Sequence, residues 1–352
     1  MKKILITALC AALCVAISMF VGGPSETKLH IYTWSDYFDP ELLEQFEKEN
    51  SCKVVIDTFD SNEAAFAKLT AGATGYDLIT PTTYFIPTME RNGIIKPFDM
   101  SLLTNVVRNF DTGYTKLVGT TNFSISVPYS FSITGIMYRK DALPEGFDEA
   151  SMDWCTFTNP VFKGRATILN DPREIVGCSM KTLGFSVNST NLEELAQALV
   201  FAKEWKRHIL KMDNEMYKSS VASSELLVAM GYNSDSLQIM QDDDKVGFVV
   251  PKSGTTCSFD EFCLSATAKH PELAHAFVNF MYDPTNASKN IEYVCATMPV
   301  KGIGEIIDPD MKNRELVIPT EEIISRCELL VELPDGALET YTKFWDELKS
   351  SK

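Results

Sequence analysis

LHIYTWSDY, Leu29–Tyr37, is the stretch that sets the fold, since its apolar and aromatic residues predict a short buried strand ending at Trp34. Ser35, Asp36 and Tyr37 follow, so an indole, a hydroxyl and a phenol lie together at the carboxyl end of the strand. Open α/β sheets bind their ligands at that edge. A second interpretation stays open, in which Trp34 plugs the core below the strand end.

Strand and helix signals alternate outward from this stretch. Lys28–Thr33, Lys53–Phe59 and Tyr76–Thr80 predict strands. Between them, Asp39-Pro40 begins one helix and Ser61-Asn62-Glu63 begins another. Strands that alternate with helices favour a parallel sheet covered by helices on its faces, so the predicted class is α/β.

The chain beyond residue 120 predicts a second lobe. Asn122–Pro128 and Gly135–Tyr138 read as two separate strands, and the short loop between them favours antiparallel pairing or passage into a second sheet. Further strands are predicted at Arg165–Leu169, Val246–Val250 and Cys257–Ala266, and helices at Leu192–Lys206, Pro271–Tyr282 and Leu338–Leu348. Leu226–Tyr232 is either a strand or the end of a helix. No flexible linker is visible, so we expect more than one segment to cross between two lobes, with a ligand cleft between them.

Residues 1–23 resemble a secretory signal. Two lysines precede the uncharged run Ile4–Val21, and small residues follow. An uncleaved membrane anchor is the alternative, because the run is nearly long enough to span a bilayer. Cys14 is better placed than Cys10 to carry a lipid, although Leu13 is bulky for that kind of cleavage site. We expect a periplasmic protein, with Cys14 as its candidate lipid-anchor residue.

The chain is strongly acidic, with a formal net charge of −16. Removal of the two lysines of the signal brings the charge near −18. Such a balance disfavours nucleic acid and suits a cationic or neutral partner, although acidity also keeps exported proteins soluble.

Metal and cofactor motifs are not evident. The seven cysteines outside the signal have no zinc-site spacing, and their odd number forbids full pairing. His270 and His275 lack nearby thiols, so we expect solvated helix positions. Neither a Gly-rich phosphate loop nor a G-x-S-x-G elbow occurs, and we expect no cofactor and no metal.

Aromatic rings, hydroxyls and carboxylates recur at the predicted strand ends. The candidate ligand-binding residues are Trp34, Ser35, Tyr37, Thr82, Tyr84, Asp171, Glu174, Tyr232 and Asp260. A linear organic polycation needs this mixture, because a buried ammonium without a partner is costly. Flat rings line its methylene spacer, and each well-placed ring adds about 0.5–2 kcal/mol of cation–π attraction.

Each candidate also has a purely structural interpretation. Asp171-Pro172-Arg173-Glu174 has the pattern of a helix start, with Asp171 as N-cap and Glu174 closing a capping box. Asp260 is then an exposed strand residue, with Glu261 on the opposite face. Tyr84 and Tyr232 are then packing residues with a satisfied hydroxyl.

From about Lys28 onward the chain resembles the periplasmic polyamine-binding proteins, the spermidine/putrescine-binding subunits of ABC importers. HIYTWSDY, LLEQFEKE, DSNE, AKLTAG, YDLITPTTYF and GIIKPFD recur in order, followed by VPYSF, the Asp171–Glu174 segment and VVPKSG. The resemblance implies a two-lobed binding protein in which each lobe is a mostly parallel sheet flanked by helices. Two or three crossing strands form its hinge, and it closes over its ligand.

The resemblance also assigns roles at the first wall of the cleft. Trp34 takes the position of the aromatic residue that stacks on the polyamine. Ser35 and Tyr37 take the adjacent hydroxyl and phenol positions, and Thr82 and Tyr84 those at the exit of the third strand.

Acidic residues complete the implied site. Asp171 and Glu174 align with residues that contact amine groups, Asp260 with the carboxylate that anchors one end of the ligand, and Tyr232 stands where the family usually has a Trp. The implied lobes comprise residues 28–134 with about 259–305, and 135–258 with about 306–352. The implied partners are a polyamine and the membrane permease subunits, and we expect a monomer without enzymatic activity.

Some positions depart from the family pattern. Ser258 replaces an aromatic residue, Leu329 and Leu330 stand where spermidine-binding members carry a polar amide, and Cys295 replaces a tyrosine loop. These changes reduce the polar contacts available to a third amine, so the resemblance favours putrescine, with spermidine also bound. Three alternatives stay open: a binding protein for another small molecule or metal ion, a hydrolase using Asp171 and Glu174, and a polyamine sensor that does not transport.

Overall fold

The computed structural model describes residues 27–118, 123–334 and 336–351, and begins with the strand that LHIYTWSDY predicts. Strand β1 (Thr27–Thr33) pairs in parallel with β2 (Cys52–Thr58) on one side and with β3 (Leu78–Ile79) on the other. Helices α2 (Pro40–Asn50) and α3 (Asn62–Thr70) connect them. The predicted α/β alternation of this first lobe is confirmed.

Local sequence explains where these helices begin. The Asp39 side chain accepts from the backbone N–H of Glu41, and Pro40 occupies the first turn of α2. Leu42 and Phe46 on the inner face of α2 are buried against the sheet. Helix α3 begins the same way, with the Ser61 hydroxyl accepting from the N–H of Ala64, and this fixed start places the first turn of α3 at the cleft.

One long strand, β5 (Ser126–Arg139), joins the two lobes, and it corrects a prediction. Asn122–Pro128 and Gly135–Tyr138 are not separate strands, since the chain stays extended through the segment between them. The first half of β5 pairs with β10 (Thr255–Ser265), whereas its second half pairs with β8 (Val228–Tyr232) and β9 (Val246–Val249). Strand β5 therefore forms ladder pairs first in one lobe and then in the other.

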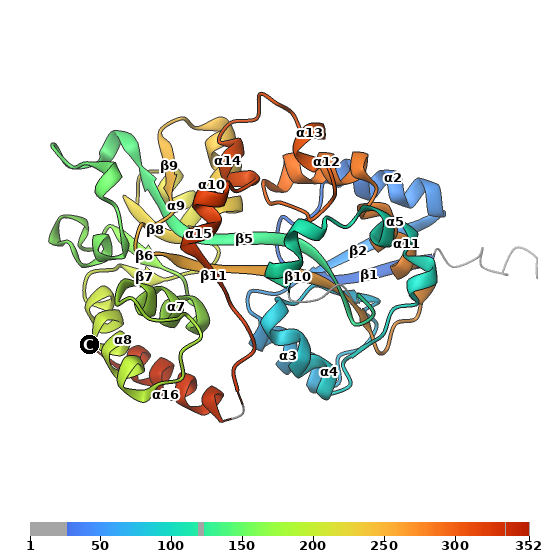
Figure 1. The fold of residues 1–352 in the computed structure, drawn as a ribbon, viewed down its shortest axis with the longest axis horizontal. Coiled ribbons are helices and arrows are strands. Elements are labelled where there is room, and N and C mark those ends of the chain that lie inside the picture. Colours follow the sequence, from blue (N-terminus) through green and yellow to red (C-terminus); the bar gives the residue numbers. More distant parts are fainter. Residues whose placement is uncertain (1–26, 119–122, 335, 352) are drawn as a thin grey trace, which may run out of the picture.

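The second lobe is a smaller sheet with its own helices. Strands β6 (Ala166–Ile168) and β7 (Lys211–Met212) are parallel to each other, and β6 is also parallel to β8. Helix α7 (Pro172–Thr182) follows β6 and packs against α8 (Leu192–Lys206). In Figure 1 these elements occupy the left half of the molecule, and β1, β2, α2 and α3 the right.

The remaining elements complete the two lobes and their connection. Strand β11 (Cys327–Leu329) pairs in parallel with β10 and is a third segment running beside the two long strands (Figure 1). Two or three crossing strands were implied, and this is confirmed. The other elements are β4 (Ile95–Lys96), α4 (Ile86–Arg91), α5 (Thr104–Asn109), α6 (Thr115–Val118), α9 (Tyr217–Ala222), α10 (Asn233–Asp242), α11 (Pro271–Met281), α12 (Pro284–Val294), α13 (Ile303–Ile306), α14 (Arg314–Val317), α15 (Glu321–Arg326) and α16 (Ala337–Ser350).

His275 is a second correction. It is 5% exposed on the inner face of α11, and its Nε2 accepts from the backbone N–H of Asp99 at 2.8 Å. The ring of His275 is therefore buried and accepts a backbone hydrogen bond, so it is not solvated. The predicted signal, including Cys10 and Cys14, lies outside the described residues. Within the described ranges no helix has the length and apolar character needed to span a bilayer.

Candidate functional site

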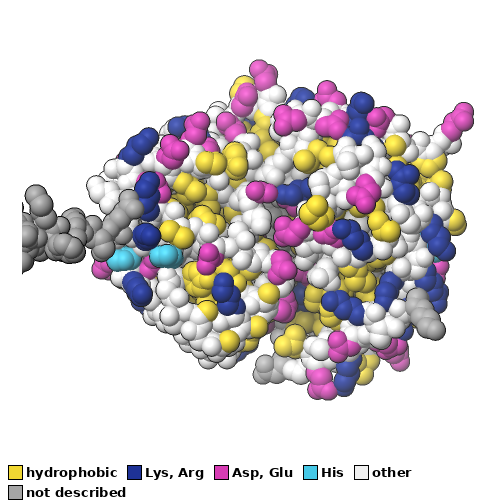
Figure 2. Space-filling view, turned by 180° about the vertical axis from the view of Figure 1, so that it is seen from behind, with side chains coloured by type: hydrophobic (Ala, Val, Ile, Leu, Met, Phe, Trp, Pro, Cys, Tyr) yellow, Lys and Arg dark blue, Asp and Glu magenta, His cyan; other side chains and the backbone are white. Residues whose placement is uncertain are grey.

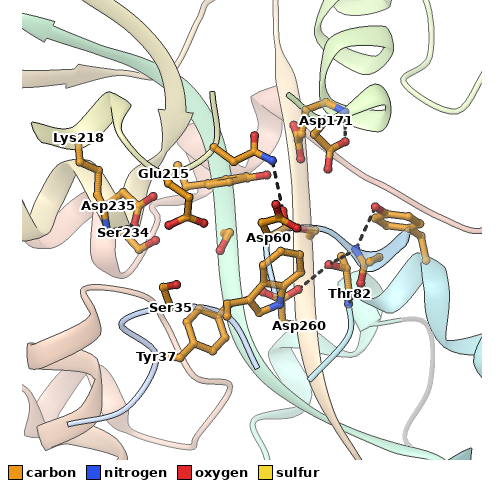
Figure 3. A pocket seen from close by; sticks show the side chains of 18 residues that line it. Ser35, Tyr37, Asp60, Thr82, Asp171, Glu215, Lys218, Ser234, Asp235 and Asp260 are labelled. Atoms are coloured by element: carbon orange, nitrogen blue, oxygen red, sulfur yellow. Dashed lines mark hydrogen bonds and ion pairs between the residues drawn. The ribbon is translucent and has the colours of Figure 1, made fainter. Parts of the chain in front are cut away.

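A pocket lies between the two lobes, and all nine candidate residues line it (Figure 3). Nine further residues share the lining: Asp60, Asn62, Ser132, Asn214, Glu215, Lys218, Ser234, Asp235 and Ser258. The cavity volume that is open to the centres of water molecules is about 90 Å³. One water needs roughly 10–15 Å³ by this measure, so the pocket has room for several waters or one slender molecule.

Asp260 is the buried carboxylate of the first wall. It lies on β10 and is 7% exposed. The Tyr37 hydroxyl donates to Oδ2, and the Thr82 hydroxyl donates to Oδ1 at 2.7 Å. Burial raises the pKa of Asp260 to about 6, although both hydrogen bonds act to lower it. Both hydroxyl partners are neutral, so this carboxylate is suited to bind a cation.

Two neighbouring acids on β10 face different surroundings, because successive side chains of a strand alternate between its faces. The pairing of β10 with β5 shifts between Asp260 and Glu261, opposite the segment that carries Pro128. Glu261 does not line the pocket and accepts from the hydroxyls of Thr83 and Ser126. Asp260 is buried, so the alternative that makes it an exposed strand residue is wrong.

Trp34 forms the aromatic surface of the first wall. Its indole N–H donates to the carbonyl oxygen of Thr80 at 2.9 Å, and its ring meets the edge of Phe59 with centroids 4.4 Å apart. The residue is half-buried and lines the pocket, so one part of the ring packs on the lobe and another faces the cavity.

Tyr84 and Thr82 are held by one amide. The Asn62 side chain donates to the Thr82 hydroxyl at 3.0 Å and to the Tyr84 hydroxyl at 3.1 Å. The guanidinium of Arg173, from the second lobe, lies 4.8 Å from the Tyr84 ring centroid. One face of this ring is therefore already occupied by a cation, and Tyr84 lines the pocket with the rest of its side chain.

The second wall begins at the amino end of α7. The Asp171 carboxylate caps this helix, accepting from the N–H groups of Arg173 and Glu174, as the sequence predicts. The Glu174 carboxylate accepts from the hydroxyls of Thr134 and Thr256, on the crossing strands β5 and β10. Burial, and then the charge of Asp171, raise the pKa of Glu174 to about 7. Burial also raises the pKa of Asp171.

Tyr232 ends β8 and lines the pocket from the second lobe. Its backbone N–H donates to the Tyr217 hydroxyl at 3.2 Å. That hydroxyl in turn donates to Asp235. This short polar network fixes the backbone at the end of β8, from which the Tyr232 side chain extends.

Sequence reasoning missed the part of the second wall that follows β7. Asn214 and Glu215 lie in the connection between this strand of two residues and α9, a helix of six, and Lys218 lies in the first turn of α9. Neither element is long enough to show periodicity. The available signal was Asp213, whose carboxylate accepts from the N–H groups of Glu215 and Met216 as a helix-start residue does.

Side chains of the two walls contact each other across the cleft. The Asn214 amide donates to the carbonyl oxygen of Asp60 at 3.2 Å. The Lys218 ammonium lies 3.1 Å from Asp36 of the first lobe and 3.2 Å from Asp235 of the second. The lobes are thus in contact, and on the face shown in Figure 2 several acidic side chains lie along the line where they meet.

The arrangement suits an organic cation better than a metal ion. Asp260 and Glu174 accept from hydroxyl groups, and the aromatic side chains of Trp34, Tyr37, Tyr84 and Tyr232 line the same pocket. In the described part of the chain, no group of three or more His, Cys, Asp or Glu side chains is placed to hold a metal.

Known proteins that this chain resembles in sequence are solute-binding proteins. The family model for bacterial extracellular solute-binding proteins matches residues 41–301. A putrescine/cadaverine-binding protein of Pseudomonas aeruginosa is 31% identical, and the match covers 99% of each chain. A spermidine/putrescine-binding periplasmic protein of Escherichia coli is 28% identical, with 98% of each chain covered.

Solved structures agree in fold. An ABC transporter structure from Listeria monocytogenes matches with a TM-score of 0.84 and 29% identity, over 93% of this chain and 100% of that one. The TpPotD lipoprotein of Treponema pallidum matches with a TM-score of 0.81 and 27% identity, over 91% of this chain and 99% of that one.

Proposed function

This chain belongs to the family of bacterial extracellular solute-binding proteins, and from that premise we propose that it captures polyamines in the interlobe pocket. It is then the binding subunit of an ABC importer and delivers its ligand to a membrane permease. Relatives named for putrescine, cadaverine and spermidine, matched over nearly their whole length, support this assignment.

One observation carries the proposal. Asp260 on the first wall and Glu174 on the second are both buried, both line the same pocket, and both accept from hydroxyl groups. A carboxylate in such surroundings gains most from a cationic partner, because the buried charge is otherwise uncompensated. We assign these acids to the two ammonium ends of a stretched diamine, and the rings of Trp34 and Tyr232 to its methylene chain.

The mechanism follows from binding to both lobes at once. The predicted lobes, residues 28–134 with about 259–305 and 135–258 with about 306–352, turn about the crossing strands. A ligand that contacts both walls shifts the population toward the closed form. The cross-cleft contacts of Asn214 and Lys218 mark where the walls meet on closure. The closed form then docks on the permease.

Localisation follows the same premise. Relatives named as periplasmic proteins support a periplasmic site of action. The relative named as a lipoprotein supports a lipid anchor, for which Cys14 is our candidate. Metabolic labelling with a fatty acid tests this, and we expect Cys14→Ser to remove the label. We further propose that the protein is monomeric and non-enzymatic.

Titration calorimetry on the protein without its signal tests the ligand. Putrescine, cadaverine, spermidine and spermine are titrated side by side, and we expect a single site for putrescine. A flat trace for all four would remove the assignment. Import into cells that carry or lack the protein separates the transport role from that of a sensor, because a sensor leaves uptake unchanged.

A further inference from the structure

Lys218 is the one cation among the described residues that line the pocket. Its side chain is 19% exposed, and it reaches the cavity from helix α9 of the second lobe. Six acids share the lining with it: Asp60, Asp171, Glu174, Glu215, Asp235 and Asp260. In a pocket whose chemistry favours cations, a resident ammonium competes for the same partners as the ligand.

The ammonium of Lys218 is fixed in place. It lies 3.2 Å from Asp235 and 3.1 Å from Asp36, which comes from the opposite lobe. The second oxygen of Asp235 accepts from the Tyr217 hydroxyl, so both oxygens of this carboxylate are engaged. Burial lowers the pKa of Lys218, but Asp235 and Asp36 outweigh it and the pKa is raised, so the side chain stays charged.

Lys218 lies at one side of the pocket. In Figure 3 it lies with Asp235 and Ser234 on one side, whereas Asp171 and Thr82 lie on the other and Asp260 lies between. A diamine held by Asp260 and the acids of α7 therefore leaves this side free. A longer polyamine with a third ammonium would have to place charge toward it.

We propose that Lys218 is a specificity-determining residue, a built-in ammonium that fills the cation position at its side of the pocket and selects diamines over triamines. This inference rests on the proposed polyamine-binding function. A third ligand ammonium would meet a like charge at short range, and the carboxylate it needs is already occupied. A diamine has only two ammonium groups, so it avoids both the repulsion from Lys218 and the need for this carboxylate.

Replacement of Lys218 by Met tests this, with putrescine and spermidine titrated into each variant. The readout is the ratio of the two dissociation constants, spermidine over putrescine. We expect the ratio to fall about tenfold or more in Lys218→Met, because Asp235 becomes available to the third ammonium. Lys218→Arg keeps the charge and should keep the wild-type ratio.

Two matched variants separate selectivity from closure. Asp36→Asn breaks the cross-cleft half of the ion pair but leaves the ammonium in the pocket, so it should change both affinities together and leave the ratio unaltered. Lys343→Met removes an exposed, ion-paired lysine on α16 and should change neither affinity. If Lys218→Met does not unfold cooperatively, Lys218→Gln replaces it.

The outcomes are distinguishable. An unchanged ratio in folded, polyamine-binding Lys218→Met overturns the inference and leaves the proposed function standing. Equal weakening of both ligands also overturns it and makes Lys218 a contact that only holds the lobes together. Wild-type protein that binds none of the polyamines overturns the proposed function instead, and the inference with it.

Discussion

The two walls of the pocket are built differently. The first wall is made from strand ends and is tied together within its own lobe and β10, since Thr82 and Tyr37 donate to Asp260. The acids of the second wall lie near the starts of helices, and two of them contact other parts of the molecule. Glu174 accepts from the crossing strands, and Asp235 holds a lysine that also reaches the first lobe.

This difference suggests a division of work. A wall whose polar groups are satisfied locally keeps its geometry when the lobes separate, so it is suited to receive the ligand first. A wall whose contacts include the hinge strands and the opposite lobe changes its partners on closure, so it is suited to couple ligand binding to closure.

Asp260→Asn removes the buried charge of the first wall and should have the largest effect on polyamine affinity. We expect polyamine affinity to fall by about 1–3 kcal/mol, because one ligand ammonium loses its counter-charge. Calorimetry measures the loss. Glu261→Gln is the matched control, since it neutralises the next residue on β10, which does not line the pocket. Equal losses in the two variants would take Asp260 off the list of ligand-binding residues.

Trp34→Ala removes the aromatic surface of the same wall. We expect an affinity loss of about 0.5–2 kcal/mol, the range of a cation–π contact. The indole is half-buried, so the unfolding temperature should fall by no more than about 2–4 °C. Calorimetry and thermal unfolding, run on one preparation, give both numbers. A variant that mainly unfolds would favour the interpretation of Trp34 as a core plug.

Glu174→Gln probes the second wall and should cost less. Gln keeps a carbonyl oxygen for the hydroxyls of Thr134 and Thr256, and an acid with a pKa of about 7 is already half neutral at pH 7. We expect an affinity loss of about 0.5–1.5 kcal/mol. If this loss exceeds that of Asp260→Asn, the second wall and not the first is the main anchor.

The same contrast explains what the sequence could reveal. Strand β1 and the turn after it were predicted because alternation, a strand end and polar residues follow one another within nine positions. Strand β5 was split in two because Ser130, Ser132 and Thr134 resemble a polar loop, although they lie in a continuous ladder. All nine candidates do line one pocket, and their contact with a ligand stays a prediction.

The residues of the second wall that the sequence did not reveal depend on contacts between distant positions of the chain. Lys218 meets Asp36 across 182 positions, and no local pattern records such a pair. Asn214 and Glu215 lie in a connection too short for periodicity. The second wall was therefore predicted only at Asp171 and Glu174, where a helix start marks it, and at Tyr232, where a strand ends.

The smallest effect should be a pH dependence that belongs mainly to the second wall. Burial raises the pKa of Glu174 to about 7 and that of Asp260 to about 6, so the ligand-free protein holds extra protons near neutrality. A bound diamine favours the ionised carboxylates, so binding releases protons and affinity rises with pH. Between pH 7 and pH 8 the change should be about twofold, because roughly half of Glu174 ionises over that interval.

Calorimetry in buffers of different ionisation enthalpy counts these protons directly. In Glu174→Gln the dependence between pH 7 and pH 8 should nearly disappear, while Asp260→Asn should retain it, because the carboxyl of Asp260 is already ionised over that interval. An unchanged pH profile in Glu174→Gln would place the titrating group elsewhere, with Asp171 next to be replaced, since burial raises its pKa as well. An affinity that fell as pH rose would mean that the ligand binds neutral acids, and the assignment of both carboxylates to ammonium groups would fail.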